Sequence, residues 1–156
     1  MAHIHTEPGQ IDFVVNVFVV HGDKVLMRYH DKYDMWLVPG GHIELNEIPE
    51  VACIREVKEE VGLDVVLYSE RKHADSEGRH ALVPPEYMDI HDTSDTHRHL
   101  VMIYFATSES METTEPTDDE KSRGLQWMTK DEIENHADIG PMIKFYALEA
   151  LKRLAS

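Results

Sequence analysis

The stretch from Pro49 to Val61 constrains the fold most strongly, because its residues alternate in polarity with the period of a helix. On a wheel of about 100° per residue, an arc of about 120° holds the apolar residues Val51, Ile54, Val57 and Val61. The opposite side holds the acidic residues Glu56, Glu59 and Glu60. Gly62 follows, at a position where helices commonly end in a left-handed residue. The pattern predicts a helix with one face towards a core and one face of carboxylates.

The carboxylate face needs compensating charge. Glu56 lies three and four residues before Glu59 and Glu60, so the three side chains are neighbours on the helix. Like charges at this spacing destabilise an isolated helix by about 0.2–0.5 kcal/mol per pair. Arg55 supplies a positive charge, whereas Glu47 adds a fourth carboxylate just before the helix. Clustered carboxylates favour a hard divalent cation such as Mg²⁺, and the alternative is a solvated acidic surface.

A glycine-bearing segment, Pro39-Gly40-Gly41, comes directly after the short apolar run Met35 to Val38 and is expected to be a tight turn. Glycines let the backbone approach a ligand closely and expose its carbonyl and amide groups. An ordinary turn is the alternative for this segment taken alone. Its position ahead of the carboxylate helix favours a binding loop.

The segment from Gly41 to Leu63, GHIELNEIPEVACIREVKEEVGL, resembles the signature of the Nudix hydrolases. That signature is a glycine, five residues, a glutamate, seven residues and then R-E-U-x-E-E-x-G-U, where U is bulky and aliphatic. Every specified position matches: Gly41, Glu47, Arg55, Glu56, Val57, Glu59, Glu60, Gly62 and Leu63. The resemblance implies an α/β (α+β) fold, a Nudix-like α/β/α sandwich with a mixed β-sheet, and we expect one such domain over residues 1–156.

The resemblance also implies an activity, the hydrolysis of a phosphoanhydride (pyrophosphate) bond with Mg²⁺ or Mn²⁺. The substrate class is a nucleoside diphosphate linked to another group, or a nucleoside triphosphate. Elementary electrostatics agrees, because a polyanionic substrate and a glutamate cluster can meet only with cations between them. The metal ligands that the family implies are Glu56, Glu59, Glu60 and the carbonyl of Gly40.

Three further residues complete the catalytic set that we predict. The planar guanidinium of Arg55 suits a bidentate hold on Glu47 or Glu56, although a weak surface ion pair is the alternative. Glu120 lies in an acidic stretch that resembles the downstream part of the family pattern, and it is a candidate metal ligand or base; the alternative is one solvated acid among many. The choice of general base stays open among Glu56, Glu59 and Glu120.

Candidate substrate-binding residues lie outside the helix. Arg28 is placed to meet a phosphate, or is an exposed strand cation; Trp36 offers a ring for a nucleobase, or is core. Gly41 brings backbone close to the substrate. His97 and His99 alternate at the start of a predicted strand, so both point to one face, and we consider His97 for substrate binding. The chain has 11 histidines, but it lacks a second cysteine and the His-Glu-x-x-His spacing, which argues against zinc.

The charge balance excludes some partners. With 30 acidic and 15 basic residues, the formal net charge is −15, which disfavours non-specific binding to nucleic acid and to anionic membranes. Cys53 is the sole cysteine, so no intrachain disulfide is possible, and we expect a cytoplasmic protein with an inert thiol. The apolar run from Phe13 to Val20 is too short to cross a bilayer.

The rest of the chain predicts strands mixed with a few helices. The expected strands are Phe13 to Val20, Lys24 to Tyr29, Met35 to Val38, Asp64 to Tyr68, Leu100 to Ala106 and Leu125 to Met128. Two more helices are expected, from Lys130 to His136 and from about Pro141 to Leu154. Glu70 to His99 is irregular and is expected to be a loop that sets substrate specificity.

A second function is compatible with the same residues. A non-catalytic Nudix-like sensor that binds a nucleotide sugar is the alternative function, although it predicts eroded carboxylates and here all are present. The markers of the ADP-ribose and diadenosine polyphosphate subgroups do not fit, so the small nucleotide substrate stays unidentified. Homodimers are common in the family, so the resemblance allows one here.

Overall fold

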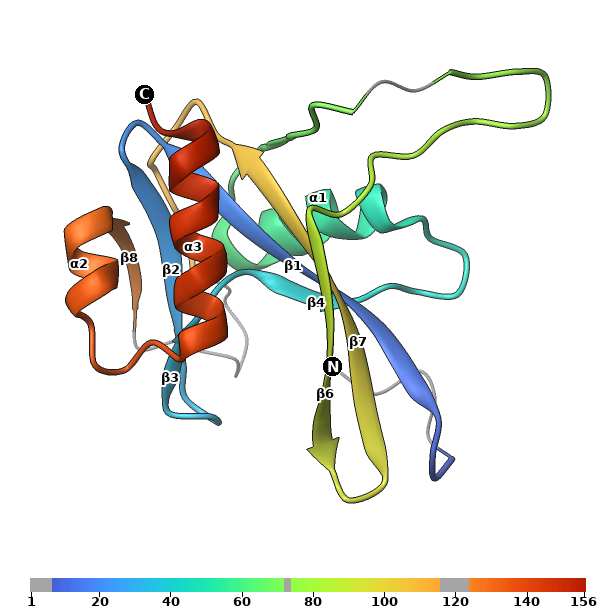
Figure 1. The fold of residues 1–156 in the computed structure, drawn as a ribbon, viewed down its shortest axis with the longest axis horizontal. Helices are drawn as coiled ribbons and strands as arrows, with labels where there is room; N and C mark the ends of the chain where they lie inside the picture. The colour runs from blue at the N-terminus through green and yellow to red at the C-terminus, as the bar shows by residue number, and fades with distance from the viewer. Residues whose placement is uncertain (1–6, 72–73, 116–123) are drawn as a thin grey trace.

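The structure is a computed structural model that describes residues 7–71, 74–115 and 124–156. These residues form one mixed sheet of eight strands together with three helices (Figure 1). The strands are β1 (Ile11–His21), β2 (Lys24–His30), β3 (Met35–Leu37), β4 (Gly40–His42), β5 (Val66–Leu67), β6 (Tyr87–Ser94), β7 (His97–Thr107) and β8 (Leu125–Thr129). The helices are α1 (Pro49–Val61), α2 (Lys130–Asn135) and α3 (Pro141–Leu154).

β1 is the strand around which the sheet is organised. The main path of the sheet runs β3-β2-β1-β7-β5, while β4 pairs with β1, β6 with β7 and β8 with β2. β1 and β7 are parallel, from Ile11 opposite Arg98 to Val20 opposite Thr107. The other strand pairs are antiparallel. The expected mixed sheet is therefore confirmed.

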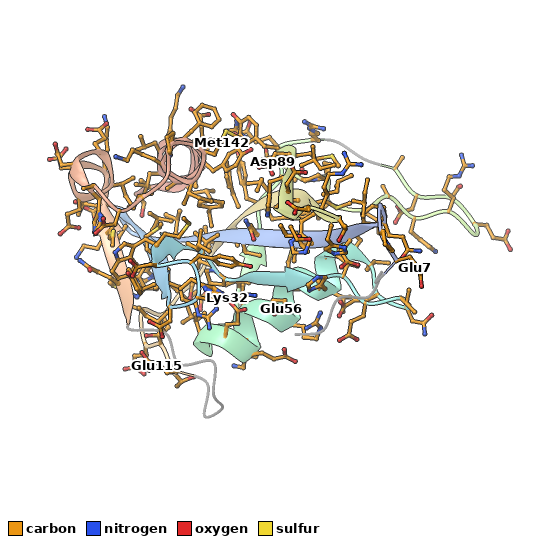
Figure 2. The ribbon with its side chains drawn as sticks, turned by 90° about the horizontal axis from the view of Figure 1, so that it is seen from below. Glu7, Lys32, Glu56, Asp89, Glu115 and Met142 are labelled. Carbon is orange, nitrogen blue, oxygen red and sulfur yellow. The ribbon has the colours of Figure 1, made fainter. Side chains whose placement is uncertain are left out.

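The two faces of the sheet carry separate cores, because successive residues of a strand point to opposite faces. The core that joins β1 to α1 includes Val15, Val17, Val19, Cys53, Val57 and Val61. The core that joins β1 to α3 includes Val14, Phe18, Val20, Tyr146, Ala147 and Leu151. Figure 1 shows α1 and α3 on opposite sides of the sheet, and Figure 2 shows Glu56 on one side and Asp89 and Met142 on the other. The fold is thus a layered α/β/α arrangement that fixes α1 against β1.

Helix α1 has the bounds that the sequence predicts. Pro49 occupies its first turn, where a missing N–H costs nothing, and Gly62 ends it with a φ of 76°. The N–H of Gly62 donates to the carbonyl of Lys58. A Cβ at Gly62 would also collide with the hydroxyl of Thr114, so both the backbone angle and the packing require glycine there.

The predicted orientation of α1 is correct for Val57 and Val61, which are buried in the core, but it is wrong for the rest of the face. Val51 and Ile54, which we expected in the core, are 49% and 46% exposed. Cys53 is buried instead, and so is Glu56, which we expected on the face away from the core. The helix is rotated about its axis so that part of its carboxylate face turns towards the protein. Glu56 is therefore shielded from water.

The tight turn expected at Gly40-Gly41 is not present. The segment Gly40-Gly41 is not a turn but part of strand β4, where Gly40 pairs with Asn16 and Gly41 with Val15. A Cβ at Gly40 would collide with the carbonyl of Val15, so glycine permits a close approach between two strands of the protein itself.

The stretch from Glu70 to His99 is less irregular than expected, because it contains β6 and the start of β7. β6 pairs antiparallel with β7, from Tyr87 opposite Ile103 to Ser94 opposite His97. The apolar residues of β6, Met88 and Ile90, are exposed, so the strand lacks the buried apolar stripe that pattern analysis detects.

The other predicted elements are confirmed with small shifts of their ends, including α2 and α3. Helix α2 begins with a capping box, in which Thr129 and Glu132 exchange side chain-to-backbone hydrogen bonds. Within the described residues, no helix is long and apolar enough to cross a membrane.

Candidate active site

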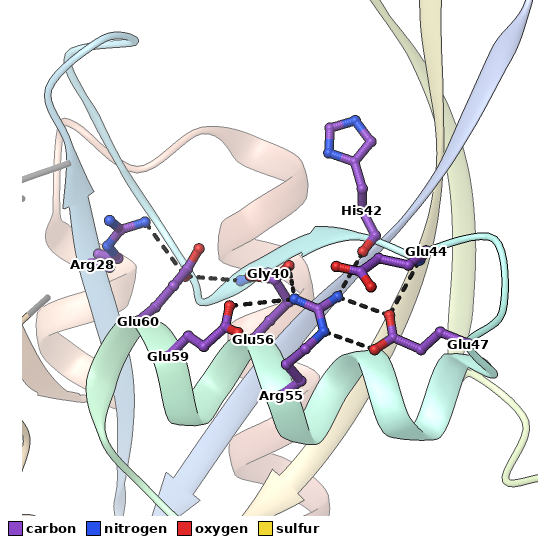
Figure 3. A network of polar contacts seen from close by, with 9 residues as sticks. All are labelled: Arg28, Gly40, His42, Glu44, Glu47, Arg55, Glu56, Glu59 and Glu60. Carbon is purple, nitrogen blue, oxygen red and sulfur yellow. Dashed lines mark hydrogen bonds and ion pairs between the residues drawn. The ribbon is translucent and has the colours of Figure 1, made fainter. Parts of the chain in front are cut away.

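Arg55 is the centre of a polar network between α1 and the segment that precedes it (Figure 3). Its Nε donates to Oε2 of Glu47 at 2.7 Å and its Nη2 donates to Oε1 of the same residue at 2.8 Å. This bidentate geometry is the strong form of an arginine–carboxylate contact. It ties the loop before α1 to the first half of the helix, as the sequence predicts for Arg55.

The other contacts of Arg55 orient the rest of the cluster. Nη1 donates to Oε1 of Glu56 at 2.8 Å and to Oε2 of Glu59 at 3.4 Å. Nη2 also donates to the backbone carbonyl of His42 at 3.0 Å. One guanidinium therefore contacts three glutamates and strand β4 at once, which sets their relative positions.

Glu56 is buried beneath β4. Its side chain is 2% exposed, and a Cβ built on Gly41 would overlap its carboxylate. Burial raises the pKa of Glu56, because a charged carboxylate loses its hydration, while the hydrogen bond from Arg55 opposes this shift. The glycine at position 41 thus makes room for a carboxylate of the protein.

Glu60 lies at the opposite end of the cluster from Glu47. Its Oε2 accepts a hydrogen bond from the backbone N–H of Gly40 at 3.2 Å and lies 3.4 Å from Nη1 of Arg28. The side chains of Arg28 and Glu60 are both largely buried. Arg28 comes from β2, so two strands and the helix together hold this carboxylate.

Among the described residues, the cluster brings together more carboxylates than guanidinium groups. Glu47, Glu56, Glu59 and Glu60 contact the guanidinium groups of Arg55 and Arg28. Arg55 holds the pKa of Glu47 below its usual range, and the two glutamates raise the pKa of Arg55, so this pair stays ionised. Glu59 is the most open of the group, with a side chain 58% exposed.

This donor set fits a hard divalent cation. Mg²⁺ and Mn²⁺ prefer carboxylate and carbonyl oxygens, and the cluster offers such oxygens with surplus negative charge. Gly40 lies beside Glu60, as its backbone hydrogen bond shows, so its carbonyl belongs to the same neighbourhood. The ligands that would hold such an ion are Glu56, Glu59, Glu60 and Gly40.

Not every predicted site residue joins this cluster. Trp36 packs against the core on the α3 side, with its ring 5.4 Å from Tyr29 and 5.8 Å from His136. His97 is buried and contacts Asp12, away from the glutamates. Glu120 lies outside the described residues.

Sequence reasoning missed His42, whose backbone carbonyl supports Arg55. Every residue has a carbonyl, so no residue pattern could have indicated this contact. Cys53 is buried, and burial raises the pKa of its thiol, as expected for an unreactive cysteine.

Comparison with protein families identifies the family of the chain. The NUDIX domain family matches residues 11–148, which include β1, the glutamate cluster and most of α3. The chain belongs to the Nudix hydrolase family. The Nudix signature that the sequence shows from Gly41 to Leu63 lies within the matched residues.

Solved structures of Nudix hydrolases share this fold. A crystal structure of a NUDIX family hydrolase from Clostridium perfringens is 40% identical, covers 91% of this chain and 97% of its own, and has a TM-score of 0.84. A MutT NUDIX hydrolase from Burkholderia pseudomallei is 18% identical over 94% of this chain and 99% of its own, with a TM-score of 0.65. At that identity the second likeness concerns the fold alone.

Curated relatives match over shorter segments. An 8-oxo-dGTP diphosphatase of Proteus vulgaris is 57% identical over 30 residues, which are 19% of this chain and 27% of that protein. Diphosphoinositol polyphosphate phosphohydrolase 3-alpha of Mus musculus is 48% identical over 42 residues, 26% of each chain. This Nudix hydrolase thus matches about a quarter of the length of these relatives.

Proposed function

We propose that this Nudix hydrolase uses its glutamate cluster and Mg²⁺ or Mn²⁺ to hydrolyse a phosphoanhydride bond. The substrate would be a small nucleotide, either a nucleoside diphosphate linked to another group or a nucleoside triphosphate. The observation that carries the proposal is the surplus of carboxylates around Arg55 and Arg28, with one of them, Glu56, almost fully buried. A site this acidic repels a diphosphate unless cations lie between them.

In the reaction, a water oxygen bonds to phosphorus while the bridging P–O bond breaks, and the bridging oxygen leaves with the other phosphate. The proton of the water passes to a carboxylate of the site. A bound divalent ion would neutralise phosphate oxygens and lower the pKa of the attacking water. Because charge spreads over the phosphoryl oxygens in the transition state, correct positioning contributes most of the catalysis.

The residues of the chain supply that positioning. Arg55 contacts Glu47, Glu56 and Glu59, so we assign it the role of orienting carboxylates and not that of binding substrate. The largely buried Arg28 lies 3.4 Å from Glu60, so we assign it the role of orienting Glu60 in addition to binding a phosphate. Glu59 is open to solvent and is accessible to an incoming substrate.

The experiment is a turnover screen of phosphoanhydrides with Mg²⁺ and with Mn²⁺, reading released phosphate or nucleotide. The panel includes nucleotide sugars, ADP-ribose, dinucleoside polyphosphates and nucleoside triphosphates. It also includes 8-oxo-dGTP and a diphosphoinositol polyphosphate, because the names of two relatives contain these compounds. We expect metal-dependent hydrolysis of at least one member.

Two variants test the site itself. Glu59→Gln and Glu60→Gln should each lower turnover by at least about tenfold, since each removes a charged oxygen ligand. Glu134→Gln on α2, which removes a partly exposed glutamate paired with Lys130, is the matched control and should retain activity. Binding of a nucleotide sugar without turnover of any compound would support the sensor alternative, and full activity in both site variants would refute the metal role of the cluster.

A further inference from the structure

A separate group of residues with metal-ligating side chains lies on the other face of the sheet. Asp12 of β1 is opposite His99 of β7, and His42 of β4 is opposite Val14 of β1. Residues 12 and 14 point to the same face, the one whose core packs against α3. The ligand atoms of Asp12, His42 and His99 all lie within 4.8 Å of one another. Figure 3 shows the His42 ring directed away from the glutamates. The backbone carbonyl of His42 accepts a hydrogen bond from Arg55, which contacts those glutamates.

The group is largely buried. Asp12 is 0% exposed and His42 is also buried, while His99 is partly buried. A buried carboxylate is costly unless it is paired or coordinates a metal. Oδ2 of Asp12 lies 3.4 Å from Nε2 of His42 and 2.7 Å from Nε2 of His97. Three strands therefore direct nitrogen and oxygen donors at one point in the interior.

The donor chemistry selects the kind of metal. Imidazole nitrogens suit Zn²⁺ and similar transition metals, whereas Mg²⁺ prefers oxygen alone. In a tetrahedral zinc site with bonds of about 2.0–2.1 Å, neighbouring ligand atoms lie about 3.3 Å apart. The separation of 3.4 Å between Asp12 and His42 is close to this value. His97 hydrogen-bonds the carboxylate, as residues behind a metal ligand commonly do.

We propose that Asp12, His42 and His99 bind a transition-metal cation of the Zn²⁺ class, at a site separate from the glutamate cluster. The ion joins β1, β4 and β7. It holds the ring of His42, whose backbone carbonyl accepts a hydrogen bond from Arg55 at 3.0 Å. His97 orients Asp12 within this site. The inference does not depend on the proposed hydrolysis, because a protein without turnover can still bind the ion.

The test is a titration of the untagged, chelator-treated protein with Zn²⁺ and with Co²⁺ in saturating Mg²⁺. Calorimetry measures the stoichiometry, and the visible absorption of bound Co²⁺ reports its ligand geometry. We expect one equivalent that Mg²⁺ does not displace, with an absorption typical of nitrogen and oxygen ligands. His99→Ala should weaken this binding by at least about tenfold.

The matched control is His80→Ala, which removes an exposed histidine with a side chain 74% accessible and should bind like the wild type. The ¹⁵N resonances of the wild-type imidazoles give a second readout that needs no variant, because Zn²⁺ should shift those of His42 and His99 but leave that of His80 unchanged. Zn²⁺ binding that is unaltered in a folded His99→Ala protein would overturn the proposal. So would wild-type imidazole resonances that do not respond to Zn²⁺.

Discussion

Gly41 lies so close to Glu56 that a Cβ at position 41 would overlap the Glu56 carboxylate. The glycine of the Nudix signature and one of its glutamates, fifteen positions apart, therefore form a direct contact between β4 and α1. The constraint on Gly41 comes from packing, since its φ is not positive. The missing Cβ of Gly41 leaves room for the Glu56 carboxylate, which is buried and in contact with Arg55.

The first prediction concerns this contact. Gly41→Ala should displace the carboxylate of Glu56 and lower kcat by about 100-fold, because a shift of about 1 Å in a catalytic group has effects of that size. Steady-state kinetics with the best substrate of the panel measures the loss. Gly140→Ala is the matched control, since a Cβ there meets nothing within 4 Å, and it should keep kcat within about twofold. A Gly41→Ala enzyme that retains the wild-type kcat would show that the position of Glu56 is unimportant.

The second prediction concerns Arg55. Arg55→Lys keeps the charge but removes the bidentate contact with Glu47 and the planar fork that also contacts Glu56. Activity should fall by at least about tenfold, and the Mg²⁺ concentration for half-maximal rate should rise. Denaturant unfolding should show a loss of about 1–3 kcal/mol. Arg153→Lys, which alters ion pairs with Glu86 and Glu149, should leave the Mg²⁺ dependence unchanged.

The third prediction concerns pH. Burial raises the pKa of Glu56 in the folded protein. The neutral form of Glu56 therefore contributes folding stability that is fully present below the pKa of an unfolded glutamate. This stability is lost as the pH rises through the folded pKa. In a role as metal ligand, Glu56 must be ionised. The acidic limb of the kcat/KM profile should therefore lie above the range of an ordinary glutamate, and higher Mg²⁺ should move it to lower pH because metal and proton compete. A limb that does not move with Mg²⁺ would contradict the ligand role.

The proton acceptor can be separated from the ligands in the same experiments. Replacing the base by Gln should remove the acidic limb of the kcat profile, whereas replacing a ligand should mainly change the metal dependence. Glu56→Gln and Glu59→Gln form the informative pair, since one residue is buried and the other is 58% exposed.

The fourth prediction concerns the end of α1. Gly62→Ala places a Cβ in a left-handed backbone and also against Thr114, so it should cost more than about 1 kcal/mol of unfolding free energy. Gly22→Ala has a similar positive φ of 59° but open space around the added carbon. Thermal or denaturant unfolding of both variants separates the two costs, and Gly62→Ala should be the more destabilising. Equal losses would mean that the Thr114 contact contributes nothing.

Local patterns in the sequence determined the bounds of α1, the cap at Gly62 and the Nudix signature, because helix period, capping and motif spacing all involve neighbouring residues. The orientation of α1 was decided by tertiary structure. Two apolar residues of the predicted core face, Val51 and Ile54, are exposed, because α1 packs on β1 and β4 through Cys53, Glu56 and Val57.

Long-range strand pairing decided the remaining features. β6 has exposed apolar residues and exists through its pairing with β7, so its own sequence carries little signal. Asp12, His42 and His99 are far apart in the chain and meet only because β4 and β7 both pair with β1. Spacing rules recognise ligands that are near in sequence, and this group has no such spacing, so only the register of the sheet brings its members together.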